Sequence, residues 1–330
     1  MAVAAAHPNI ALIKYWGNRD HALRLPSNGS ISLTLGGLHT VTRVRFDARL
    51  AVDVVRIDRR PATPAEHARV ASHLDLVRGL AGLAARAEVT SASDFPVGAG
   101  LASSASAFAA LTLAATAAAG LDLGRAELSR LARRGSGSAC RSIFGGFVEW
   151  RLGDDDASSF AEPLDESAAW PLADVIAIVS QSAKPVGSTE GHRLAESSPL
   201  QPARVASAPS RLAACRQAIL EQDFARLAEV VELDCHLMHA VMQTSSPPLL
   251  YWAPASLAVM QAVRAWRAAG DPVCYTLDAG PNVHCVCPAS TAGAVAARLR
   301  DVAGVVEVLT ASAGGPAALL SPDDPRLALL

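Results

Sequence analysis

Apolar and polar residues alternate along residues 28–57, NGSISLTLGGLHTVTRVRFDARLAVDVVRI, a segment rich in Val, Ile and Thr. A two-residue period is typical of strands with one buried face, so this segment predicts an antiparallel hairpin or meander, broken at Gly36 and Gly37. Short apolar runs predict further strands at residues 87–96, before Trp150, and at 173–181, 273–280, 283–288 and 305–313.

Segments with helical spacing lie between these runs, without a regular strand–helix–strand repeat. The first helix is predicted within residues 63–87, where Thr63 and Glu66 have the spacing of a capping box, and another begins with Asp122 as its N-cap. Residues 103–119 are Ala-rich and too short to span a bilayer, which predicts a buried core helix. The remaining helices are predicted at residues 203–221, 224–242, 254–269 and 290–302. This mixture favours an α+β fold over a doubly wound parallel sheet.

A chain of 330 residues exceeds what one core usually supports, so we expect two domains. The best boundary is the acidic, loop-like segment 153–172, which is followed by an apolar strand. We therefore predict an N-terminal domain over residues 1–171 and a C-terminal domain over residues 172–330.

Charge and composition narrow the class of protein. The 29 Lys and Arg residues balance 31 Asp and Glu residues, so the chain lacks the basic excess of a nucleic-acid or membrane-surface protein. An anionic ligand would need a local site. The first residues, MAVAAAHPNIALIKYW, lack the basic segment and unbroken apolar stretch of a secretory signal, and we expect a cytoplasmic protein with reduced thiols.

Two groups of residues have side chains that bind metals in other proteins. Cys285 and Cys287 lie in an apolar run without a second cysteine pair, so burial in a core is the stronger interpretation. Asp234, His236 and His239 share a predicted helix, but the segment lacks the His-Glu-x-x-His order of a zinc site. We interpret that helix as structural or substrate-lining.

The strongest local signal for chemistry is FPVGAGLASSASAF, residues 95–108. Its glycines let a backbone approach a ligand closely, and Ser103 and Ser104 fall where a helix begins with unpaired N–H groups. Such an arrangement holds phosphate, although an ordinary helix start has the same composition. The segment has neither the Gly-Lys-Ser/Thr of a Walker A loop nor a dinucleotide fingerprint.

Pro96, Gly100, Leu101, Ser103 and Ser104 match the P-x-x-x-G-L-x-S-S pattern of the GHMP kinase superfamily, which this chain resembles. NIALIKYWGNRD with LPSNGSISLTL, RRGSGSACRSIFGGFVEW, and YTLDAGPNV resemble, in that order, segments of its mevalonate diphosphate decarboxylase branch. The resemblance implies a two-domain GHMP-kinase fold with the active site in the cleft between the domains. It also implies an ATP-dependent decarboxylase of a 5-phosphorylated mevalonate in isoprenoid biosynthesis, with ATP and Mg2+ as cofactors.

Asp278 and Lys14 could have ordinary roles, as a turn former and as a strand-edge lysine. By resemblance, Asp278 is the catalytic aspartate that orients or deprotonates the 3-hydroxyl for attack on the ATP γ-phosphate. Lys14 would lie beside it and help to keep the carboxylate ionised. Arg141, otherwise a surface cation, would grip the substrate carboxylate with its guanidinium fork. The phosphorylated alcohol would then lose phosphate and CO2 to leave an alkene.

The resemblance assigns the remaining site residues to two groups. The substrate group comprises Tyr15, Asn18, Ser136, Gly137, Ser138 and Ser188, with donors of residues 136–138 directed to the 5-phosphate. The ATP group comprises Pro96, Gly98, Gly100, Leu101, Ser103 and Ser104, with the Ser104 hydroxyl near Mg2+. The partners expected are therefore small molecules, and the resemblance also allows a homodimer.

Asn18 stands where most relatives have a lysine that helps to hold the 5-diphosphate. Because a diphosphate carries more charge than a monophosphate, this difference favours mevalonate 5-phosphate as substrate and isopentenyl phosphate as product. Mevalonate 5-diphosphate is the alternative, since Arg19, Arg24 or Lys184 could restore the charge. A kinase without decarboxylation and a non-catalytic sensor of isoprenoid precursors are further alternatives, and the retained catalytic residues weigh against both.

Overall fold

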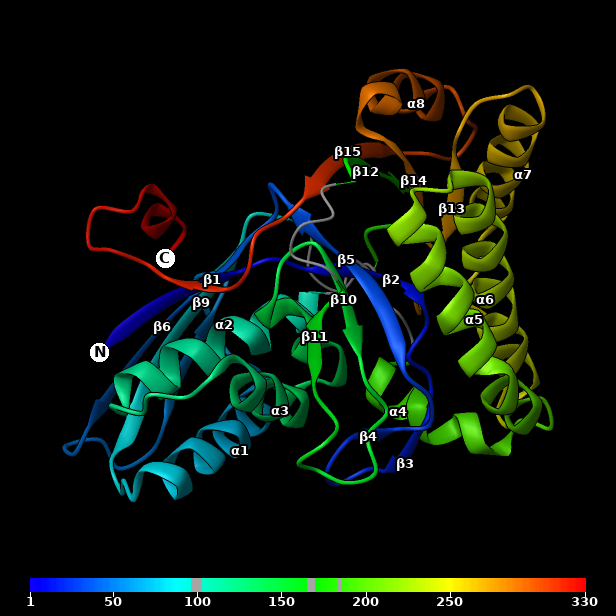
Figure 1. Ribbon diagram of the computed structural model, residues 1–330. Helices are drawn as coiled ribbons and strands as arrows, with labels where there is room; N and C mark the ends of the chain where they lie inside the picture. Colours follow the sequence, from blue (N-terminus) through cyan, green and yellow to red (C-terminus); the bar gives the residue numbers. More distant parts are fainter. Residues whose placement is uncertain (96–102, 165–169, 183–185) are drawn as a thin grey trace.

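The structure is a computed structural model that describes residues 1–95, 103–164, 170–182 and 186–330. Its strands form sheets of six, eight and two strands, and helices pack beside the two larger sheets (Figure 1). Strands and helices are mixed without a strand–helix–strand repeat, which confirms the predicted α+β fold.

The first sheet has the strand order β16-β1-β6-β9-β7-β8, and only β7 and β9 run parallel. Its strands are β1 (Ala2–Ala6), β6 (Thr40–Asp47), β7 (Val54–Ile57), β8 (Arg60–Pro61), β9 (Arg86–Ser93) and β16 (Ala318–Leu319). On one side of this sheet lie α1 (Pro64–Ala81), α2 (Ser103–Ala118) and α3 (Arg125–Gly135) (Figure 1).

The second sheet combines strands from both halves of the chain, in the order β11-β10-β5-β15-β12-β14-β13, with β2 paired to β5. Its strands are β2 (Asn9–Ile13), β5 (Ser30–Gly36), β10 (Phe147–Trp150), β11 (Ala161–Pro163), β12 (Leu172–Ile178), β13 (Cys274–Thr276), β14 (Val283–Pro288) and β15 (Glu307–Ala313). The link is β15, because Ser312 pairs with both Gly36 of β5 and Ala173 of β12. The domain boundary at residues 171 and 172 falls just before β12 and stays a prediction.

The hairpin predicted within residues 28–57 is wrong, because β5 and β6 belong to different sheets. The chain passes between the sheets at Gly36 and Gly37. Gly37 has a φ of 83°, and a Cβ on Gly36 would lie 3.0 Å from the carbonyl oxygen of Ala313. Consecutive strands are usually neighbours in a sheet, so the local pattern favours a hairpin. Here, pairing with strands that are distant along the chain places β5 and β6 in different sheets.

Two predicted helix starts had different outcomes. At α1 the capping box is confirmed, since Thr63 Oγ1 accepts the Glu66 N–H at 3.3 Å and the Glu66 carboxylate accepts the Thr63 N–H at 2.8 Å. At α3, Asp122 is not the N-cap. That position is Gly124, whose N–H donates to the Glu127 carboxylate at 2.8 Å.

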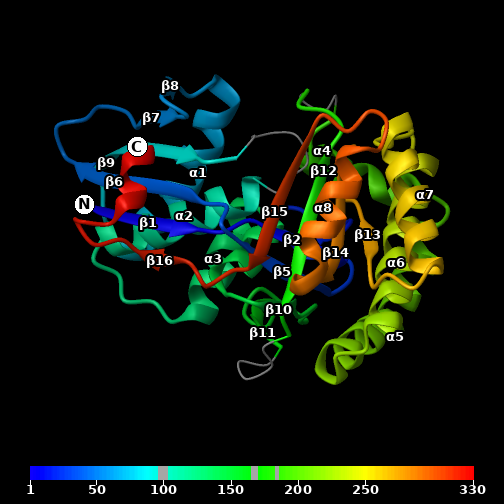
Figure 2. The same ribbon diagram turned by 90° about the horizontal axis from the view of Figure 1, so that it is seen from above.

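The predicted helices of the C-terminal half are confirmed as α5 (Gln201–Glu221), α6 (Phe224–Thr244), α7 (Pro254–Ala268) and α8 (Ala292–Arg300). Figure 2 shows α5, α6 and α7 along the outer side of the strands β13 and β14. Cys285 and Cys287 are buried in this region with Val259 and Val295, which confirms their interpretation as core residues. In the described part of the chain, no helix combines the length and apolarity needed to cross a membrane.

Candidate active site

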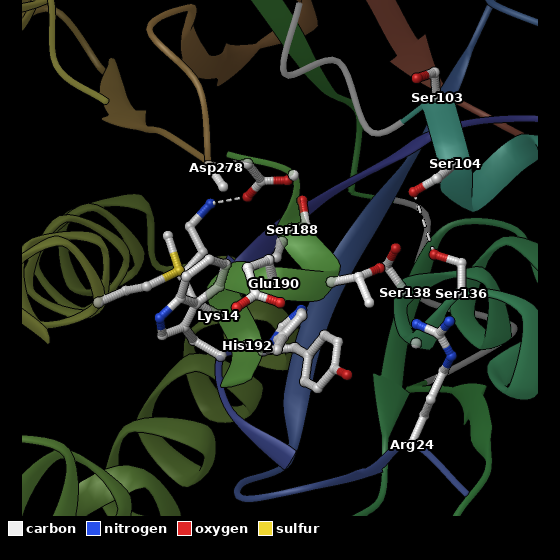
Figure 3. Close-up of a pocket in the computed structure, with 18 of the residues that line it drawn as sticks. Lys14, Arg24, Ser103, Ser104, Ser136, Ser138, Ser188, Glu190, His192 and Asp278 are labelled. Carbon is white, nitrogen blue, oxygen red and sulfur yellow. Dashed lines mark hydrogen bonds and ion pairs between the residues drawn. The ribbon is translucent and has the colours of Figure 1, made fainter. Parts of the chain in front are cut away.

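Lys14 and Asp278 form an ion pair although 264 residues separate them along the chain. Lys14 Nζ lies 2.6 Å from Asp278 Oδ1 (Figure 3). Lys14 directly follows β2 and its side chain is 1% exposed, whereas Asp278 follows β13 and is 26% exposed. The carboxylate therefore reaches the cavity described below while the ammonium group supports it from the protein interior.

Two opposing effects set the pKa of Asp278. Burial raises it, but the Lys14 ammonium group, His284 and Arg141 lower it, and the resulting pKa lies below the usual value. The carboxylate is therefore ionised at neutral pH and can accept a hydrogen bond from a ligand hydroxyl.

A buried network from α5 and α6 fixes the backbone of Lys14. Asp234 accepts the Lys14 N–H at 2.6 Å and Arg211 Nε at 2.6 Å. The Lys14 carbonyl accepts Arg204 Nη2 at 2.8 Å and Asn28 Nδ2 at 2.9 Å. Because both backbone groups of Lys14 are paired with buried side chains, its side chain extends toward Asp278 from a fixed position.

The helix that carries Asp234, His236 and His239 is structural. Asp234 belongs to the network around Lys14, and His236 Nε2 lies 2.8 Å from the Tyr275 hydroxyl. Burial lowers the pKa of His239 to about 3, so this histidine is neutral at physiological pH. These contacts agree with a structural role, and Met238 of the same helix lines the cavity described below, so both parts of the interpretation fit.

Arg141 lies in a short 3-10 helix, η1 (Gly137–Ile143), and lines the cavity. Its Nη1 donates to Ser30 Oγ at 2.6 Å and its Nη2 to Asn9 Oδ1 at 3.0 Å. Burial is the main cause of the lowered pKa of Arg141. A desolvated guanidinium group held in this way is suited to a carboxylate ligand.

The start of η1 faces the start of α2. Ser136 Oγ lies 3.2 Å from Ser104 Oγ, which connects the two serine-rich segments (Figure 3). A Cβ on Gly137 would lie 2.4 Å from the Tyr15 ring, so the close contact between η1 and Tyr15 requires glycine. Hydroxyl groups from both segments thus line one cavity.

Asn18 does not line this cavity. Its Oδ1 accepts a hydrogen bond from the Tyr15 hydroxyl at 2.5 Å, and the residue is buried. Tyr15 does line the cavity, and its ring stacks on His192 with 4.1 Å between the centroids. Burial raises the pKa of Tyr15, so the phenol stays protonated and donates to Asn18. The effect of Asn18 on a ligand is therefore indirect, through Tyr15.

The cavity, of about 480 Å³, collects most of the residues that the sequence singled out. These are Lys14, Tyr15, Ser103, Ser104, Ser136, Gly137, Ser138, Arg141, Ser188 and Asp278. The sequence did not single out Ala11, Trp16, Arg69, Gly187, Thr189, Glu190, His192, Met238 and Ala279, which also line it. Most of these lie beside predicted site residues along the chain, whereas Arg69, on α1, had no motif that could have revealed it.

A second cavity, of about 170 Å³, shares Arg69, Ser103 and Ser104 with the first. Its apolar lining residues are Val55, Ile57, Val70, Val89, Ala107, Phe108 and Leu111, and its hydroxyl groups include those of Thr40, Thr42, Ser91 and Ser93. The sequence did not reveal this cavity, because its lining residues, which also include Asp58 and Glu66, come from several separate segments. The two cavities meet at the start of α2.

Some of the predicted residues lie outside the described part of the chain, namely Pro96, Gly98, Gly100, Leu101 and Lys184. The structure describes the other two cations that could replace the charge missing at Asn18, and these two differ in position. Arg19 is exposed and its Nη2 donates to the Gly153 carbonyl at 2.5 Å, whereas Arg24 lines the main cavity.

Two family models match the chain. The diphosphomevalonate decarboxylase-like N-terminal domain matches residues 6–161, and the mevalonate 5-diphosphate decarboxylase C-terminal domain matches residues 174–318. Together they cover most of the chain.

Individual relatives agree with the family models. The diphosphomevalonate decarboxylase of Aspergillus fumigatus is 40% identical over 303 residues, which cover 85% of this chain and 75% of that protein. The crystal structure of mevalonate diphosphate decarboxylase from Staphylococcus aureus has a TM-score of 0.93 at 37% identity, covering 97% of this chain and 98% of the other. A structure described as "MDDEF in complex with MVAPP, AMPPCP and Magnesium" has a TM-score of 0.92 at 39% identity, with the same coverage. This chain therefore belongs to the diphosphomevalonate decarboxylase family of the GHMP kinase superfamily.

Proposed function

We propose that this protein is an ATP-dependent decarboxylase that converts mevalonate 5-diphosphate to isopentenyl diphosphate in isoprenoid biosynthesis. The ion pair of Lys14 with Asp278, in one cavity with the buried cation Arg141, carries the proposal. It supplies a fixed carboxylate for a hydroxyl group and a guanidinium group for a carboxylate, which are the two functional groups at the reacting end of mevalonate.

The comparisons favour the diphosphate substrate over the mevalonate 5-phosphate that Asn18 suggested from the sequence. The relatives reported above are named for the diphosphate, and the related complex contains MVAPP. The position of Asn18 behind Tyr15 also weakens the argument for a monophosphate, because Asn18 is not among the residues that line the cavity, whereas the cation Arg24 is.

In the proposed reaction, Arg141 binds the substrate carboxylate and Asp278 accepts a hydrogen bond from the 3-hydroxyl. The hydroxyl oxygen bonds to the γ-phosphorus of ATP, the bond to ADP breaks, and the hydroxyl proton passes to Asp278. Lys14 stabilises the ionised form of Asp278 before the transfer and limits repulsion between that carboxylate and the phosphoryl group.

Phosphorylation converts hydroxide, a poor leaving group, into phosphate. When the bond from C3 to this phosphate breaks, the electron pair of the bond between C2 and the carboxyl carbon forms the C2–C3 double bond. CO2 and inorganic phosphate are released. Arg141 holds the carboxylate before the loss of CO2 and so fixes the orientation of the bond that breaks.

The second cavity suits the base of ATP, because apolar residues form part of its wall, beside Asp58 and Glu66, while Ser103 and Ser104 lie where it meets the main cavity. No cluster of three His, Cys, Asp or Glu side chains in the described ranges could hold a metal ion. This fits Mg2+, which commonly binds through nucleotide phosphates and water, with the Ser104 hydroxyl as the candidate protein ligand. When bound, Mg2+ would neutralise charge on the phosphates. The related complex named for AMPPCP and magnesium supports ATP and Mg2+ as ligands.

Parallel assays of ADP, CO2 and inorganic phosphate release test the proposal, with mevalonate, its 5-phosphate and its 5-diphosphate as substrates. We expect equal amounts of the three products, with the highest kcat/KM for the 5-diphosphate. ADP without CO2 would identify a kinase, and no product would identify a binding protein. A clear preference for the 5-phosphate would restore the hypothesis drawn from Asn18.

A further inference from the structure

Arg24 is a cation in the main cavity whose guanidinium group is only partly used. It lies between β3 (Asn18–Asp20) and β4 (Leu25–Pro26), and its side chain points toward Ser136 and Ser138 (Figure 3). Its Nε donates to the Arg134 carbonyl at 3.0 Å, which is the one hydrogen bond of this guanidinium group in the described ranges. That bond sets the direction of the side chain and leaves both Nη groups for a ligand.

The charges around Arg24 favour an anion. Burial lowers the pKa of Arg24, Tyr15 acts in the opposite direction, and Arg193 lowers the pKa further. Arg69 lines the same cavity, and burial and then Arg24 lower its pKa, while Glu66 raises it. Two desolvated cations that repel one another do not stabilise the fold. An anionic ligand between Arg24 and Arg69 would offset the free-energy cost of burying the two cations and would weaken the repulsion between them.

The backbone directs Arg24 into this position. Its φ is 52°, in the left-handed region that residues other than glycine rarely adopt. The preceding residue is held on both sides, since the Leu23 N–H donates to Asp20 Oδ1 at 2.7 Å and the Leu23 carbonyl accepts Arg133 Nε at 3.1 Å. An uncommon conformation maintained by its neighbours is typical of functional sites.

We propose that Arg24 binds the terminal phosphate of the substrate's 5-diphosphate, beside the hydroxyl groups of Ser136 and Ser138. The inference rests on the proposed function and deepens it, because it assigns the second phosphate to a residue that determines specificity. A guanidinium group binds phosphate through two parallel hydrogen bonds. ATP is the other source of phosphate, but Arg24 lines only the main cavity, whereas Arg69 and Ser104 line both.

Steady-state kinetics of Arg24→Met with both phosphorylated substrates test the assignment. We expect kcat/KM for mevalonate 5-diphosphate to fall about 10- to 100-fold, the loss expected for a charged hydrogen bond. The value for mevalonate 5-phosphate should change by less than about threefold, and KM for ATP by less than about twofold, because neither ligand places a phosphate on Arg24. Arg24→Lys, which keeps the charge but not the fork, should recover part of the loss.

Arg19→Met is the matched control, since Arg19 lies in the same segment but is exposed and outside the lining of the cavity. We expect it to behave as the wild type with both substrates. Thermal unfolding of each variant separates lost folding from lost binding.

The remaining outcomes each contradict the assignment. Equal losses with the two substrates would show that Arg24 does not distinguish their phosphates, and a raised KM for ATP would place the ATP phosphates on Arg24. If the wild type released no ADP or CO2, the proposed function would fail, but calorimetry with mevalonate 5-diphosphate and inorganic pyrophosphate would still decide the role of Arg24. Unchanged affinity of Arg24→Met for both ligands would then overturn it.

Discussion

Two parts of the main cavity differ in how their charges are paired: the proposed reaction end, formed by Lys14 and Asp278, and the proposed phosphate end, formed by Arg24 with Ser136 and Ser138. At the reaction end, Lys14 is 2.6 Å from Asp278, and its backbone is held through Asp234. At the phosphate end, Arg24 makes one hydrogen bond to the residues that the structure describes, through Nε. In the proposed reaction, the groups that take part in bond formation are thus held in a fixed geometry by the protein, whereas Arg24 keeps both Nη groups for the proposed phosphate. Variants at the first end should mainly change kcat, and variants at the second should mainly change KM.

Asp278→Asn is the strongest test of the reaction end. The amide keeps the shape of the side chain, but it cannot take the hydroxyl proton and forms no ion pair with the Lys14 ammonium group. We expect kcat to fall about 10³-fold, within the range for loss of general acid–base catalysis, while the affinity for mevalonate 5-diphosphate changes little. ADP release and calorimetry measure the two quantities. Activity within tenfold of the wild type would remove Asp278 from the reaction.

Lys14→Met should reduce kcat about 100-fold and change its dependence on pH. In the wild type, the Lys14 ammonium group helps to hold the pKa of Asp278 below its usual value, so the carboxylate is ionised at neutral pH. Without the ammonium group, burial raises that pKa with less opposition, and the acidic decline in kcat should move to higher pH. Lys14→Arg keeps the charge and serves as the control. Profiles that coincide for wild type and Lys14→Met would contradict the role given to Lys14.

Asp234→Asn tests whether the fixed backbone of Lys14 matters for catalysis. The variant keeps the shape of the side chain but leaves Arg211 buried without its charge partner, so the free energy of unfolding should fall by about 3 kcal/mol. We expect kcat to fall about tenfold with KM within about twofold, because Lys14 moves relative to Asp278.

The matched control is Asp271→Asn, which breaks an exposed pair with Arg298. It should cost less than about 1 kcal/mol of stability and leave kcat unchanged. Urea unfolding and steady-state kinetics measure both variants. Lower stability of Asp234→Asn with unchanged kcat would show that the network supports the fold but not the reaction.

Ser104→Ala should have the smallest effect. Its hydroxyl lies where the two cavities meet, so we expect KM for ATP to rise about three- to tenfold, as for one lost hydrogen bond, with KM for the substrate unchanged. Ser210→Ala, on the exposed side of α5, is the control. An equal rise in both KM values would place Ser104 at the substrate instead.

The sequence was most informative where chemistry is carried by a residue within a short motif. Lys14, Arg141 and Asp278 could be identified in this way, and all three line the main cavity. Arg24 could be named only as one of three cations near Asn18, because the left-handed turn that directs its side chain depends on hydrogen bonds from distant segments. The second cavity could not be predicted, since its lining residues come from separate strands and helices that only the fold brings together.

The alternation of apolar and polar residues likewise depends only on neighbouring residues in the sequence. It identified β5 and β6 as strands but not their partners, which lie up to about 280 residues away along the chain. Which strands pair depends on contacts between distant segments. The hydrophobic pattern of one segment therefore does not predict its partner.

The pairing of β16 with β1 has a consequence for how the molecule can be made. Ala4 and Ala5 pair with Leu319 and Ala318, so a chain synthesised only as far as residue 300 would leave β1 as an open edge of the first sheet. It would also lack β15, which joins β5 to β12. Open edges pair readily with other chains. We therefore expect nascent chains and truncated fragments of this protein to aggregate, even those long enough to contain every residue of the reaction end.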